Sequence, residues 1–139
     1  MGMESSVRYL DGSKFEVITR GHTVLCDQPL SNGGADEGMS PPEFLLASLA
    51  TCAGYYALQY LKTRSLPTAG LEVRISAEKA LQPARLAGFR IDVVVPGMGE
   101  ERHRDGILRA VKSCLIHNTL LHAPAIEIAI EEKAAGASA

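Results

Sequence analysis

Two cysteines, Cys52 and Cys114, are the side chains of this sequence best suited to covalent chemistry. Only the thiolate form of a cysteine is a strong nucleophile, and a pair of cysteines is of more interest than either one alone. Cys114 lies where two helical segments meet, so that free N–H groups and a helix dipole would stabilise its thiolate. The alternative stays open that each cysteine is simply a small buried apolar residue, and their separation in sequence does not show that they meet.

Two histidines, His117 and His122, follow Cys114 and raise the question of a metal site. No CxxC or HxxxH spacing completes a ligand set, so we expect no metal and no bound organic cofactor. We expect His117 on a helix, at the mouth of a cysteine pocket or at a subunit interface. A Cys–His acyl-transfer site is chemically conceivable, but the sequence holds no oxyanion-hole motif and no third orienting residue.

Composition limits the class of protein and its partners. The 139 residues are 46% apolar, with 14 Lys+Arg against 16 Asp+Glu, so the sequence predicts one folded domain over residues 1–133 and a frayed tail over 134–139. The mixed charges provide no basic surface for nucleic acid or for a membrane. An odd number of cysteines and an N-terminus without an apolar stretch favour the cytoplasm.

The central segment from Ser40 to about Arg64 is predicted to be a helix. Ser40 precedes Pro41-Pro42-Glu43, the pattern of a capping box with proline in the first turn. The uncharged stretch Phe44–Leu61 is near the lower limit of a membrane span, but its hydroxyl groups, tyrosines and glycine fit a helix buried on nearly all sides. A small domain rarely surrounds such a helix alone, which implies a partner subunit.

The elements on either side of this helix predict an α+β fold. We expect a meander of strands over Val7–Cys26, a loop over Asp27–Ser40, alternating strands near Leu71–Ala77 and Phe89–Val95, helices over Glu100–Ser113 and Leu115–Leu121, and a last strand over Ile126–Ile130. Short connections without a repeated βαβ unit favour a largely antiparallel sheet with helices on one face.

Three segments together resemble the OsmC/Ohr family. They are Ser40-Pro-Pro-Glu-Phe-Leu-Leu-Ala-Ser-Leu-Ala-Thr-Cys52, the strand Gly88-Phe-Arg-Ile-Asp-Val93, and Cys114-Leu-Ile-His-Asn-Thr-Leu120. The resemblance covers roughly residues 20–131. It implies a mainly antiparallel α+β fold with a long buried central helix, in an intertwined homodimer with active sites at the subunit interface.

The resemblance also implies an activity. In that family the first cysteine, here Cys52, attacks an organic hydroperoxide, and the second, here Cys114, forms a disulfide that dithiols or lipoylated proteins reduce. Arg20 corresponds roughly to the family's arginine, with a solvated strand end as its alternative role. Glu43 is the candidate supporting carboxylate, but it lies one position after the expected place, which Pro42 occupies, and a capping role is the alternative.

A second departure is the Cys-Leu-Ile-His start of the later motif, where hydroperoxide reductases of this family commonly have Cys-Pro. The resemblance therefore leaves two functions open. One is a cysteine-based peroxidase, and the other is a non-catalytic dimer that binds a small molecule in an apolar cleft. Cys26 matches no cysteine of the family, and we expect it to pack at a strand end.

Overall fold

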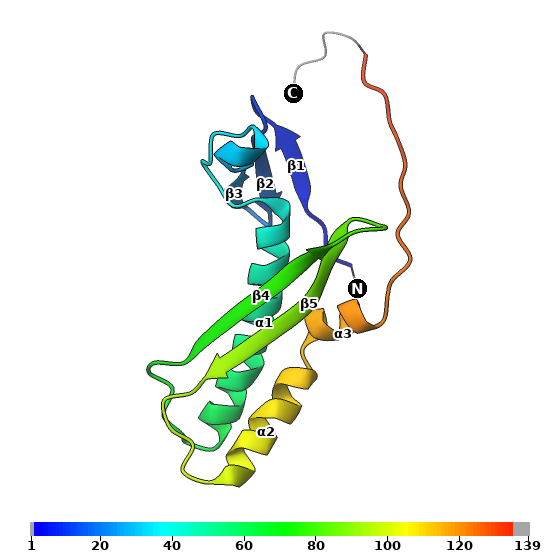
Figure 1. The fold of residues 1–139 in the computed structure, drawn as a ribbon. Coiled ribbons are helices and arrows are strands. Elements are labelled where there is room, and N and C mark those ends of the chain that lie inside the picture. Colours follow the sequence, from blue (N-terminus) through cyan, green and yellow to red (C-terminus); the bar gives the residue numbers. More distant parts are fainter. Residues whose placement is uncertain (1, 135–139) are drawn as a thin grey trace.

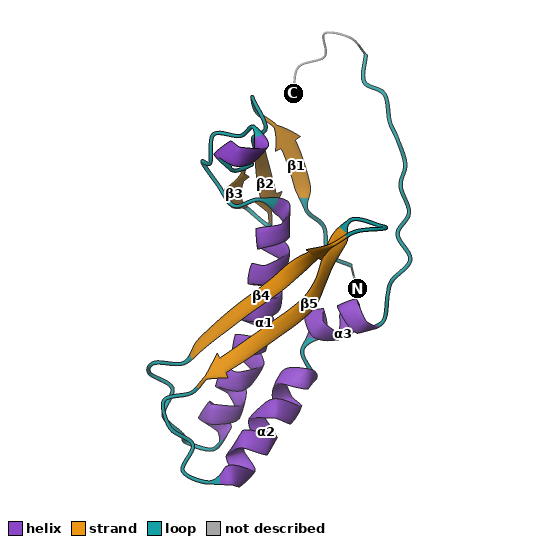
Figure 2. Ribbon diagram, viewed as in Figure 1, coloured by secondary structure: helices purple, strands orange, loops and turns teal. Residues whose placement is uncertain are grey.

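The structure is a computed structural model that describes residues 2–134. Its elements form two antiparallel sheets and three α-helices (Figures 1 and 2). In chain order they are β1 (Ser6–Tyr9), β2 (Phe15–Thr19), β3 (His22–Cys26), the short 3-10 helix η1 (Leu30–Asn32), α1 (Pro41–Thr63), β4 (Glu72–Ala80), β5 (Arg85–Val94), α2 (Glu101–Lys112) and α3 (Leu115–Leu121). The predicted α+β class is confirmed.

The N-terminal strands form the predicted meander, in the order β1-β2-β3. Strands β2 and β3 are joined at Arg20 and Gly21, whose φ angles are 50° and 84°. Positive φ at both central residues of a two-residue connection matches the right-handed twist of the flanking strands. This geometry explains why a glycine follows Arg20 in the sequence.

The loop after β3 is held by one carboxylate. Asp27 is fully buried, and it accepts hydrogen bonds from Ser13 Oγ at 2.6 Å and from the backbone N–H groups of Gln28, Ala35 and Glu37 at 2.7, 3.2 and 3.1 Å. These donors, the Ser13 hydroxyl first, lower the pKa of Asp27 to about 2. The predicted loop over 27–40 is therefore an ordered connection between the small sheet and α1.

Helix α1 begins where the capping box predicts. The Glu43 carboxylate accepts hydrogen bonds from Ser40 N at 2.9 Å and from Ser40 Oγ at 2.7 Å. Within one chain the buried residues of α1 form a single stripe, made of Leu49, Ala53, Ala57 and Leu61, and Tyr55 on another side is 57% exposed. The expected burial on nearly all sides is thus not reached by one chain alone.

By length and composition alone, α1 could cross a membrane. In this fold, however, β4 and β5 cross one side of it, and α2 and α3 lie along another (Figure 2). That arrangement is the one expected of a core helix, and we treat α1 as such.

Strands β4 and β5 form a hairpin whose two faces differ. Charged residues such as Arg74 and Asp92, which are register partners, lie on the outer face. Val73, Ile91 and Val93 alternate with them and pack against the buried core of α1 and α2. Because side chains in a strand alternate between faces, this period-two pattern orients the hairpin on the helices.

Two features differ from the prediction. The strands of one chain form two separate sheets, of three and two strands, where one sheet was expected. The segment Ile126–Ile130 is not a strand in the described residues, and its isoleucines are 80–95% exposed. Figure 1 shows this segment as an extended chain apart from both sheets. A strand forms only when its backbone finds a pairing edge, and this chain offers none beside it. Residues 135–139 of the expected tail lie outside the described part.

Candidate redox site and the adjoining cavity

The fold brings Cys52 and Cys114 together. Cys52 is half-buried in the middle of α1, and Cys114 is fully buried at the N-cap of α3, a helix that packs against α1. The two thiols are neighbours, because Cys52 is one of the groups that raise the pKa of the Cys114 thiol. Two cysteines far apart in the sequence therefore share one site, and both are free thiols.

The surroundings of Cys114 favour its protonated form. Burial, and after it the neighbouring Cys52 side chain, raise the pKa of the Cys114 thiol, while the backbone N–H groups of His117 and Ile116 act in the opposite direction.

Glu43 has the capping role that was its alternative. Ser40 is its hydrogen-bonding partner through both the hydroxyl and the backbone N–H. These contacts lower the pKa of the Glu43 carboxyl. The carboxylate lies at the N-terminus of α1, and the contacts recorded for it in residues 2–134 are to Ser40 and to neither cysteine.

Arg20 lies in the hairpin turn between β2 and β3, where its side chain is exposed. It borders shallow surface hollows with Met3 and Glu4. In the described part of the chain, no hydrogen bond or ion pair connects it to either thiol. One chain alone therefore does not bring Arg20 to the cysteine pair.

Cys26 ends β3, where it pairs with Phe15 of β2 and bridges to Met39. Burial, followed by the negative charge of Asp27, raises the pKa of its thiol. An unreactive, protonated thiol at a strand end agrees with the packing role predicted for it.

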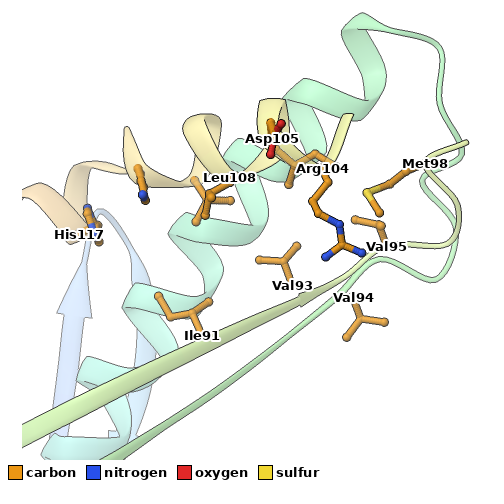
Figure 3. A pocket seen from close by; sticks show the side chains of 12 residues that line it. Ile91, Val93, Val94, Val95, Met98, Arg104, Asp105, Leu108 and His117 are labelled. Atoms are coloured by element: carbon orange, nitrogen blue, oxygen red, sulfur yellow. The ribbon is translucent and has the colours of Figure 1, made fainter. Parts of the chain in front are cut away.

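A cavity of about 670 Å³ lies between β5 and α2 (Figure 3). Its lining is mainly apolar. The apolar residues include Ile91 and Val93 in β5, Val95 just after this strand, and Ile107, Leu108 and Val111 in α2. Arg104, Asp105, Lys112 and His117 add polar groups. The Nδ1 atom of His117 is buried and has no hydrogen-bond partner in the described residues. His117 lies on α3, as predicted, and it lines this cavity, which neither Cys52 nor Cys114 lines.

The start of α2 is partly buried, although five of residues 100–105 are charged. His103 is only 8% exposed, and its Nδ1 lies 3.0 Å from the Tyr60 hydroxyl. The Arg64 guanidinium lies 3.8 Å from the centre of the Tyr60 ring. Gly106 makes room for this tyrosine, because a Cβ at position 106 would overlap the phenol. The signal in the sequence is the spacing of four residues between His103 and Ile107, which places both on one face of the helix.

Within residues 2–134, no group of three or more His, Cys, Asp and Glu side chains is placed to hold a metal ion.

The fold defines an α+β protein with two antiparallel sheets around a long central helix. The family model described as OsmC-like protein matches residues 33–129, and the chain belongs to this family. Among the curated protein sequences compared with it, none matches this chain.

Solved structures share the fold. A protein assigned to osmotic stress and detoxification response in Psychrobacter arcticus 273-4 is 20% identical, with a TM-score of 0.77, over 86% of this chain and 89% of that chain. An OsmC-like protein from Mycoplasma pneumoniae is 18% identical, with a TM-score of 0.71, over 88% of this chain and 89% of that one. An organic hydroperoxide resistance protein from Elizabethkingia anophelis is 20% identical, with a TM-score of 0.60, over 86% and 87%. At these identities the likeness concerns the fold.

Proposed function

We propose that this protein is a thiol-dependent peroxidase that reduces organic hydroperoxides through Cys52 and Cys114. The observation that carries the proposal is the proximity of the two free thiols, which the packing of α3 against α1 brings about. A nucleophile and its resolving partner must lie within a side-chain movement of each other if a disulfide is to form. The family membership and the hydroperoxide resistance protein among the similar structures support the same chemistry.

The difference in burial between the two cysteines assigns the roles. Cys114 is fully buried and the pKa of its thiol is raised, so the half-buried Cys52 is the attacking residue. Cys52 sulfur bonds to the terminal peroxide oxygen, the O–O bond breaks, and the leaving alkoxide takes a proton to become an alcohol. The product on Cys52 is a sulfenic acid.

Cys114 then completes the cycle. Its sulfur attacks the Cys52 sulfenic acid, the S–O bond breaks, and the thiol proton leaves with the hydroxyl as water. A Cys52–Cys114 disulfide results, and a dithiol or a lipoylated protein returns both residues to thiols by exchange. We place this cycle in the cytoplasm, where structural thiols stay reduced.

The working form that we propose is a homodimer. The exposed isoleucines of residues 126–130 alternate with Glu127, Ala129 and Glu131 as a strand with one buried face does. A second copy would offer the sheet edge that this segment lacks, and it would also cover the exposed side of α1. Such a dimer also allows Arg20 to reach the thiols of the partner subunit.

The dimer can be tested with one charged substitution. Ile128→Lys places a charge in the proposed interface, so the variant should elute as a monomer in size-exclusion chromatography with light scattering. Leu81→Lys is the matched control, since Leu81 is 78% exposed in the β4–β5 turn. A wild-type monomer, or equal behaviour of the two variants, would contradict the proposed interface.

A second candidate is a non-catalytic protein that binds a small molecule, and the apolar cavity between β5 and α2 favours it. One assay separates the two functions. Consumption of cumene hydroperoxide with dithiothreitol is followed for the wild type, Cys52→Ser and the control Cys26→Ser. The peroxidase proposal predicts turnover by the wild type and Cys26→Ser, and loss of at least a hundredfold in Cys52→Ser, because general thiol chemistry without the nucleophile contributes little. Equal rates for all three proteins would exclude it.

A further inference from the structure

The cavity between β5 and α2 has the size and lining of a ligand site. At about 670 Å³ it lies within the range of roughly 300–1,000 Å³ that is typical of small-molecule pockets. Its apolar walls require a ligand that is mostly hydrocarbon. Neither Cys52 nor Cys114 is part of the lining, although the cavity adjoins the thiol pair at His117. The inference concerns ligand binding and does not depend on the proposed peroxidase activity.

The charged groups of the lining select the sign of the ligand. Arg104 and Lys112 are cationic, and Asp105 is the one carboxylate among the lining residues. Figure 3 shows the Arg104 side chain extending from α2 toward β5, over the same space that Val93 and Val95 border. The balance of charge favours an anion, and a single negative charge is preferred because Asp105 would repel a doubly charged group.

Arg104 has donors to spare for such a ligand. Its guanidinium pairs with Glu101, but the N–O distance is 3.6 Å and both side chains are largely exposed, so this pair contributes little. A guanidinium presents five donors in a planar fork that matches a carboxylate. A ligand carboxylate can therefore bind Arg104 without displacing a strong interaction.

The buried Nδ1 atom of His117 is an independent observation that favours a polar ligand group in this cavity. Its Nδ1 is buried without a partner in residues 2–134, although it borders the same cavity. An unsatisfied buried polar atom is costly, and a ligand in the cavity can satisfy it. In Figure 3, His117 lies at the end of the cavity toward α3, while Arg104 lies toward the other end.

We propose that this cavity binds a hydrocarbon monocarboxylate, with the carboxylate on Arg104, the chain along β5, and a polar or unsaturated position of the ligand at His117. The Arg104 side chain fixes the orientation of the ligand. The apolar residues of β5 and α2 supply most of the contact area.

Isothermal titration calorimetry of the full, reduced chain with sodium octanoate tests the proposal. Octanoate should bind. Octanamide has the same shape without the charge, and its affinity should be lower by about tenfold or more, as expected for the loss of a hydrogen bond to a charged group. Arg104→Gln should weaken octanoate binding by about the same factor. Arg109→Gln is the matched control, because Arg109 is exposed on the same helix and does not line the cavity.

A second measurement checks the cavity itself. Octanoate should shift the imidazole nitrogen resonances of His117 and leave those of the exposed His22 unchanged, and Val93→Phe should abolish binding by filling the space. Three results would overturn the proposal. They are no binding of octanoate, as when a second copy of the chain fills the cavity, equal affinity for octanoate and octanamide, or equal effects of Arg104→Gln and Arg109→Gln on the affinity for octanoate. None of these outcomes bears on peroxide turnover, which reports on Cys52.

Discussion

The Cys114 thiol, buried at the start of α3, lies next to the Cys52 side chain in the middle of α1. This proximity depends on α3 packing against α1, since no local segment connects the two residues. Cys114 is fully buried and the pKa of its thiol is raised, whereas Cys52 is half-buried. This difference in burial is the structural basis for treating Cys52 as the nucleophile and Cys114 as the resolving thiol.

Asp27 should make folding stability sensitive to acid. Its pKa is about 2 in the folded protein against 3.8 ordinarily, so the folded state binds the proton less readily than the unfolded chain does. The stabilisation is therefore complete above about pH 4 and is lost as the pH falls toward 2. Asp27→Asn should lower the free energy of unfolding at pH 7 and flatten its dependence on pH in this range.

Urea denaturation at a series of pH values provides the measurement. Asp36→Asn is the matched control, because Asp36 is an exposed acid of the same loop and asparagine tolerates its φ of 56°. If both variants kept the acid dependence of the wild type, the hydrogen bonds to Asp27 would not be the source of that dependence.

Ser40→Ala should destabilise the protein by about 1 kcal/mol, because alanine cannot take part in the capping box with Glu43. Thermal unfolding followed by circular dichroism would show the loss. Thr51→Ala serves as the control, since the Thr51 hydroxyl bonds only to carbonyls of its own helix. A rate of peroxide turnover unchanged in Ser40→Ala would agree with a purely structural role for the pair.

Gly106 and Tyr60 should be coupled in stability. Gly106→Ala places a methyl group against the phenol of Tyr60, and overpacking of this kind typically costs about 1–3 kcal/mol. The double variant Gly106→Ala, Tyr60→Leu should recover part of the loss, because the shorter side chain leaves room. A double-mutant cycle by urea denaturation measures this coupling, and strict additivity of the two changes would contradict the packing described.

The substitution Arg20→Asn distinguishes the role of Arg20 in the β2–β3 turn from a role of its side chain in peroxide turnover. Asparagine tolerates the left-handed backbone that Arg20 adopts at φ 50°, so the unfolding midpoint should stay near that of the wild type. If Arg20 of the partner subunit supports the thiolate, peroxide turnover should fall by about tenfold or more, as for the loss of one charge-assisted hydrogen bond. An undiminished rate in a folded dimer would remove Arg20 from the site.

Periodicity predicted most of the fold, because local patterns decide local structure. The capping box defined the start of α1, Leu115–Leu121 was predicted with the bounds that α3 has, and alternation in Val73 and Ile91 identified the β4–β5 hairpin. The same alternation over Ile126–Ile130 predicted a strand that the single chain does not form. A sequence shows that a segment is suited to pairing, but whether an edge is available depends on the tertiary and quaternary arrangement.

The candidate site was only partly predictable for a related reason. Cys52 and Cys114 were named from their residue type and from the family resemblance, but their contact arises from the packing of α3 on α1. Arg104 was missed, because an arginine among charged neighbours at a helix start resembles a solvated surface. Its relation to the cavity depends on the position of β5, which no spacing in the sequence specifies.

The most direct test of the cysteine pair is mass spectrometry of the protein after one equivalent of cumene hydroperoxide, digested without reductant. The account predicts loss of two hydrogens and a peptide pair joined through Cys52 and Cys114, with Cys26 unmodified. In Cys114→Ser, the same treatment should leave a sulfenic acid on Cys52 that dimedone traps. Oxidised protein in which Cys52 and Cys114 are not joined, or in which Cys26 is the residue that reacts, would contradict it.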